Sequence, residues 1–71
     1  MGIKNRLLEI RLSLGYKKQK DFADFLGLKK SIYSKFENNF SQPTTEGLYL
    51  IAKKLNMRME DIIYYEEPTS E

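Results

Sequence analysis

The sequence predicts an all-α fold, a compact domain of five short helices. Apolar residues recur at i, i+3, i+4 and i+7 spacing rather than in alternation, Val is absent, and Gly and Pro interrupt the chain at helix-sized intervals. A chain of 71 residues is short for more than one domain. We therefore assign residues 1–65 to one folded domain and residues 66–71 to an acidic, disordered tail.

The first three helices follow from apolar stripes and from the residues that end them. The first covers residues 3–14 and is ended by Gly15, and the second covers residues 19–26 and is ended by Gly27. The third covers residues 30–38 and precedes an Asn, which tolerates a positive φ.

The fourth helix is the most clearly amphipathic stretch. Pro43 precedes it, Thr44 is its expected N-cap, and its inward face carries Leu48, Ile51, Ala52 and Leu55. A short fifth helix covers residues 57–64. Because such short helices are marginal alone, packing must stabilise them. We expect the core to contain four aromatic residues at helical spacing: Phe22, Phe25, Tyr33 and Phe36.

The composition excludes most catalytic chemistry. The chain contains neither Cys nor His, which removes thiolate nucleophiles, imidazole bases and the usual zinc ligands. We therefore expect no enzyme activity, no metal, no cofactor and no small-molecule ligand. No apolar run approaches the length that a bilayer requires, and no signal-peptide pattern is visible, so we expect a cytoplasmic protein without membrane contact.

Charge is unevenly distributed along the chain. Residues 1–63 contain all 12 Lys and Arg but only seven of the ten acidic residues. A basic body suits a polyanionic partner such as nucleic acid, although many Lys residues serve only solubility. The position of the basic residues must decide between these interpretations.

The second and third predicted helices have the layout of a helix-turn-helix motif. Each is about two turns long, and a short turn led by Gly27 joins them, so the second of the pair can enter a major groove. On that helix the outward positions are all hydrogen-bond donors, and no acid occurs before Glu37. These outward residues are Lys30, Ser31, Ser34 and Lys35.

Residues 3–63 resemble the phage repressor and Cro family of helix-turn-helix domains, the XRE type. The family pattern Gln-Glu-Glu-Leu-Ala-Glu-Lys-Leu-Gly corresponds to residues 19–27, and its Glu-Asn-Gly corresponds to Glu37-Asn38-Asn39. Its Pro-Ser-Leu-Glu-Thr-Leu corresponds to residues 43–48, and Ile-Ala-Lys-Ala-Leu corresponds to residues 51–55. The match runs without a gap from Gly27 to Ile63.

The resemblance implies two groups of DNA-contacting residues. The base-contacting positions are occupied by Lys30, Ser31, Ser34 and Lys35, among which the two Lys residues are the leading readers because they can donate to guanine. The phosphate-contacting positions are Lys18, Gln19, Lys29, Asn38 and Thr44. For Thr44 a simple N-cap is an equally good explanation.

A structural ion pair is expected between Arg11 and Glu37. Arg11 lies on the apolar stripe of the first helix, where an unpaired charge is costly, and Glu37 lies on the inward side of the third helix. The family resemblance pairs the same two positions.

The sequence departs from the family pattern at four places. Asn39 replaces the usual Gly after the third helix, and Asn accepts the left-handed conformation. Lys29 stands where Ser or Thr normally caps the recognition helix, which is poor capping unless an anion lies nearby. Gly47 lies inside the fourth helix, where close backbone approach is one explanation. One residue is inserted between Gly15 and Lys18, which weakens the Lys18 assignment.

Two hypotheses of function follow. The first is a sequence-specific transcriptional regulator that binds double-stranded DNA at a pseudo-palindrome as a homodimer, with an interface drawn from Phe40, Tyr49, Leu50 and Tyr65. The alternative is a protein-interaction module, such as an antitoxin or adaptor, on the same fold. The operator, the sign of regulation and the type of regulator (phage repressor, Cro-like protein, restriction-modification controller or antitoxin) stay open.

Overall fold

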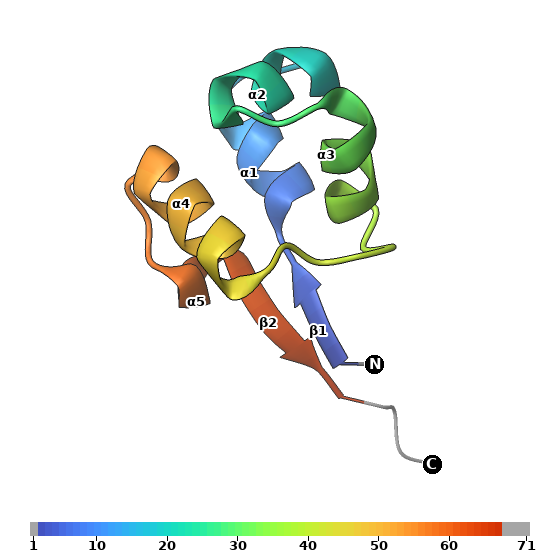
Figure 1. The fold of residues 1–71 in the computed structure, drawn as a ribbon, viewed down its shortest axis with the longest axis vertical. Coiled ribbons are helices and arrows are strands. Elements are labelled where there is room, and N and C mark those ends of the chain that lie inside the picture. The colour runs from blue at the N-terminus through green and yellow to red at the C-terminus, as the bar shows by residue number, and fades with distance from the viewer. Residues whose placement is uncertain (1, 68–71) are drawn as a thin grey trace.

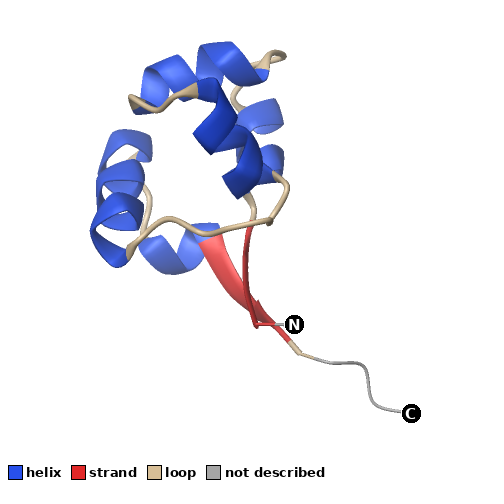
Figure 2. Cartoon of the chain, turned by 45° about the vertical axis from the view of Figure 1, so that its right-hand side comes forward, coloured by secondary structure: helices blue, strands red, loops and turns tan. Residues whose placement is uncertain are grey.

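The computed structural model describes residues 2–67, which form five helices and two short strands. The elements are β1 (Gly2–Asn5), α1 (Leu7–Ser13), α2 (Gln19–Leu26), α3 (Lys30–Glu37), α4 (Thr45–Leu55), α5 (Met59–Ile62) and β2 (Ile63–Glu66). The helices pack into a body, and the two strands extend from it side by side (Figure 1). Figure 2 shows the same separation between the helical body and the ribbon of strands.

The all-α prediction holds only in part because β1 and β2 form an antiparallel sheet. Ile3 lies opposite Tyr65, and Asn5 lies opposite Ile63. The predicted first helix therefore begins only at residue 7, and the predicted fifth helix ends at residue 62. β-Branched and aromatic residues favour strands, but the partners lie about 60 residues apart, so local periodicity does not reveal the pairing.

The sheet also reaches the segment predicted as an acidic tail. Glu66 is the last residue of β2 and lies opposite Gly2. The Glu66 carboxylate lies 3.7 Å from the Lys4 ammonium on the neighbouring strand. Residues 68–71 of the predicted tail lie outside the described residues.

The core contains residues from every helix. Phe22 and Tyr33 are completely buried, and their rings meet edge to face at 5.5 Å between centroids. Phe36 is partly buried as expected. Phe25 was expected in the core but is 38% exposed, although its ring stacks on Phe22 at 6.1 Å. The other buried apolar residues are Leu7, Ile10, Ala23, Leu26, Leu48, Ile51, Ala52 and Ile62.

The residues that begin and end the helices explain the turns between them. Gly27 ends α2 in the left-handed conformation, with φ of 77°, which places α3 across α2. Asn39 adopts φ of 60° after α3, as its amide side chain allows. The Thr44 hydroxyl accepts from the Gly47 amide at 3.1 Å, which confirms the predicted N-cap of α4. A Cβ on Gly47 would lie 3.3 Å from that hydroxyl, so a close approach exists there.

Asn5 connects the sheet to α3 and to the loop that follows α3. Its amide nitrogen donates to the Phe36 carbonyl at 2.7 Å and to the Gln42 side chain at 2.8 Å. Its amide oxygen accepts from the Leu7 backbone N–H at 3.0 Å. The Asn5 backbone N–H donates to the Asn39 side chain at 2.9 Å. One buried side chain therefore links β1, α1, α3 and the loop that follows α3.

We expect Asn5→Ala to lower the free energy of unfolding by about 2–4 kcal/mol, because it leaves buried polar partners unsatisfied. Urea denaturation monitored by circular dichroism measures this loss. Asn38→Ala is the matched control, since Asn38 is exposed and its amide bonds only to Ser34, so its loss should cost about 1 kcal/mol. Equal stability of the two variants would contradict the role assigned to Asn5.

Candidate nucleic-acid interface

Packing of α3 against α2 and α1 decides which side chains of α3 face water. Tyr33 is buried, and its hydroxyl donates to the Leu7 carbonyl at 3.5 Å. Lys30, Ser31 and Lys35 are exposed, whereas Ser34 is half-buried. The four predicted base-contacting residues therefore lie on one short helix, three of them open to a partner.

The segment that contains α3 exposes basic side chains and no acidic one. Residues 28–45 contain Lys29, Lys30 and Lys35 but a single acidic residue, Glu37, which is buried. Within residues 2–67, no carboxylate forms an ion pair with any of these three Lys side chains. Their charges are consequently available to an anion outside the chain.

Arg11 neutralises the one acid of this region. The Arg11 Nε donates to one Glu37 oxygen at 2.8 Å, and Nη2 donates to the other at 3.3 Å. The remaining nitrogen, Nη1, donates to the carbonyls of Tyr16 at 3.0 Å and Lys17 at 2.7 Å. The predicted ion pair is thus present and bidentate, and it also holds the loop between α1 and α2.

The Glu37 carboxylate has further donors. The Gln19 amide donates to it at 2.8 Å from the first turn of α2. Burial alone would raise the pKa of Glu37, but hydrogen bonds from Arg11 and Gln19 outweigh burial and lower it. The bond to Glu37 occupies one of the two amide N–H donors of Gln19, a predicted phosphate contact.

The other predicted phosphate contacts lie at helix ends. Lys18 and Lys29 are the N-caps of α2 and α3, and neither helix start has a side-chain cap. The first N–H groups of both helices are therefore without a side-chain acceptor, the arrangement that accommodates a phosphate. The Thr44 hydroxyl keeps its proton as a donor while it caps α4. The Asn38 amide donates to Ser34, to its carbonyl at 3.0 Å and its hydroxyl at 3.3 Å.

The loop after α3 contains features that sequence reasoning missed. Asn39 accepts from both the Asn5 backbone and the Gln42 side chain, so the loop is tied to β1. The sequence contains no signal for this network, because Asn5 falls inside the predicted first helix.

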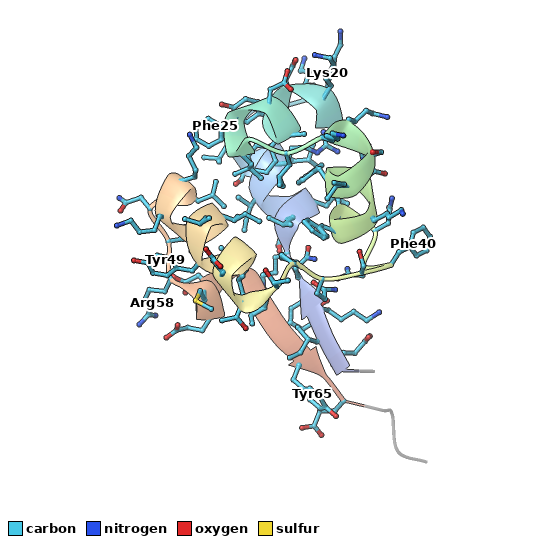
Figure 3. The ribbon with its side chains drawn as sticks, viewed as in Figure 1. Lys20, Phe25, Phe40, Tyr49, Arg58 and Tyr65 are labelled. Atoms are coloured by element: carbon cyan, nitrogen blue, oxygen red, sulfur yellow. The ribbon has the colours of Figure 1, made fainter. Side chains whose placement is uncertain are left out.

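The four apolar residues predicted for a dimer interface do not form one patch. Figure 3 shows Phe40 beside the end of α3, Tyr49 on α4 and Tyr65 at the end of the ribbon, on separate sides of the molecule. Leu50, like the other three, is exposed. An interface that uses all four residues together is therefore not formed by this surface.

Two negative observations concern residues 2–67. No group of three or more acidic, His or Cys side chains is arranged to hold a metal ion in this part of the chain. None of the described helices has the length and apolar character needed to cross a membrane.

The two short crossed helices and the Gly27 turn between them define a helix-turn-helix domain. The model of the helix-turn-helix family matches residues 7–62 of the chain. The chain therefore belongs to this family of DNA-binding transcription regulators, as its resemblance to the phage repressor and Cro (XRE) type predicts. No curated protein and no solved structure matches the chain.

Stability should fall in acid through protonation of Glu37. A carboxyl whose pKa is lowered by folding stabilises the protein above its unfolded pKa of about 4.3. This stabilisation is lost as the pH falls through the lower, folded pKa. We expect Glu37→Gln to cost about 3–5 kcal/mol at pH 7, because it leaves Arg11 buried without its counter-charge, and to flatten the dependence on pH below 4.

Chemical denaturation between pH 7 and pH 2.5 measures this effect. Asp24→Asn is the matched control, because Asp24 pairs with Lys20 only at the exposed surface. A pH profile of Glu37→Gln identical to that of the wild type would contradict the assignment.

Proposed function

We propose that the chain is a sequence-specific transcriptional regulator that places α3 in the major groove of double-stranded DNA. One observation carries this proposal: every exposed polar side chain of α3 carries a hydrogen-bond donor and none carries a negative charge, while its single acid is buried against Arg11. DNA presents phosphates and base acceptors at the positions such a face would meet.

Base readout is assigned to Lys30, Ser31, Ser34 and Lys35. The two Lys residues supply most of the discrimination, since a hydroxyl both donates and accepts and so distinguishes bases weakly. Phosphate contacts are assigned to the starts of α2, α3 and α4 and to the end of α3, through Lys18, Gln19, Lys29, Asn38 and Thr44.

The regulator is proposed to act as a homodimer on a pseudo-palindrome. One short helix reads only a few base pairs, and two copies about one helical turn (~34 Å) apart read two half-sites. Of the exposed apolar residues, Tyr49 and Leu50 are neighbours on α4, which makes α4 the best-supported dimer surface.

Selection of the purified protein against a randomised duplex library tests the proposal. The salt concentration is held at about 150 mM because phosphate contacts weaken steeply with salt. A two-fold symmetric enriched site supports a dimeric regulator. Binding without enrichment contradicts sequence-specific recognition, and no binding at all favours the protein-interaction alternative.

We expect Lys35→Ala to weaken binding to the selected site by roughly 10- to 100-fold and to relax the preference at one position of each half-site. Fluorescence anisotropy with selected and substituted duplexes measures both effects. Lys4→Ala is the matched control, because it removes the same charge from β1, outside α3 and outside the proposed dimer surface on α4. Equal losses in the two variants would show that Lys35 contributes only general electrostatic attraction.

A further inference from the structure

Phe40 is unusual among the apolar side chains. Its side chain is 82% exposed, the highest value among the exposed large apolar residues of the described chain. Figure 3 shows it pointing away from the body beside the end of α3. Exposed apolar residues are common, so exposure alone does not assign a role.

The backbone around Phe40 is fixed rather than merely exposed. The Phe40 N–H donates to the Lys35 carbonyl at 2.9 Å, and the Ser41 N–H reaches the same carbonyl at 3.3 Å. Asn39, in its left-handed conformation, accepts from Asn5 and from Gln42. The chain therefore folds back onto the last turn of α3. These bonds fix the position of the Phe40 backbone, from which the ring extends.

The surroundings of Phe40 favour DNA over a second copy of the chain. Its sequence neighbours Asn38, Asn39, Ser41 and Gln42 are all polar, and Lys35 lies on the adjoining turn. A protein interface has an apolar centre, whereas a DNA backbone presents apolar deoxyribose faces between phosphates. A single aromatic ring among polar side chains matches the DNA backbone better than the apolar centre of a protein interface.

We infer that Phe40 packs against deoxyribose of the DNA backbone at the edge of the groove that α3 enters. This inference rests on the function proposed above, and it adds an apolar contact to an interface otherwise made of donors. Deoxyribose is the same in every sequence, so the contact contributes affinity without specificity. Because no charge is involved, it releases no counterion.

Binding of Phe40→Ala to the selected duplex and to a scrambled duplex tests the inference. We expect about a tenfold loss of affinity for both duplexes, as expected for losing the burial of one aromatic ring. The slope of log affinity against log salt should stay unchanged, in contrast to a phosphate-contacting residue, whose loss makes the slope shallower by about one. Phe40→Leu should retain most of the affinity.

Leu12→Ala is the matched control, since it removes an exposed apolar side chain from α1, outside both the proposed DNA-contacting residues and the proposed dimer surface on α4. Thermal unfolding and sedimentation of each variant report whether folding or self-association has changed. Phe40→Leu keeps the test valid if Phe40→Ala is destabilised.

Three results would overturn the inference. If the wild type binds DNA and a folded Phe40→Ala variant binds it with the same affinity, the Phe40 contact is rejected while the proposed function stands. A weaker self-association of Phe40→Ala would place Phe40 in a dimer interface instead. Failure of the wild type to bind any duplex rejects the inference together with the proposed function.

Discussion

The arrangement of this domain depends on the buried ion pair between Arg11 and Glu37. The guanidinium binds the carboxylate of α3 and two carbonyls of the loop before α2, so it fixes both segments relative to α1. Gln19 adds a bond from α2 to the same carboxylate. The pair also removes the only negative charge between residues 28 and 45 from the surface. One interaction therefore both orients α3 and leaves its exposed face without a negative charge.

The first turns of α2 and α3 lack stabilising caps at the positions where DNA phosphates are proposed to bind. Both helices begin at an exposed Lys and lack a side-chain cap, whereas α4 is capped by Thr44. A cation at a helix start opposes the macrodipole by about 0.3–1 kcal/mol, and a phosphate placed there reverses the effect. The poor capping predicted at Lys29 is thus present in the structure, and DNA supplies the missing acceptor in the proposed complex.

The sequence predicted the elements that local signals define and missed those made by distant residues. The bounds of α2 were predicted because Gly27 ends an apolar stripe, and Thr44 was identified because it follows Pro43. The β1–β2 sheet was missed because each strand has four residues and its partner lies at the other end of the chain. The Arg11–Glu37 pair was predictable, since a charge on an apolar stripe requires a partner. The Asn5 network depends on the sheet and so could not be predicted.

The most direct test of the central claim is an amide chemical-shift titration of the labelled protein with a selected duplex. We predict that the amides of residues 29–35, 38–42 and 44 shift most, together with those at the start of α2. The chemical shifts of the amides in the C-terminal half of α4 should change little when DNA is added. Shifts concentrated on α4, with α3 unaffected, would contradict the claim that the basic face of α3 is the DNA-binding surface.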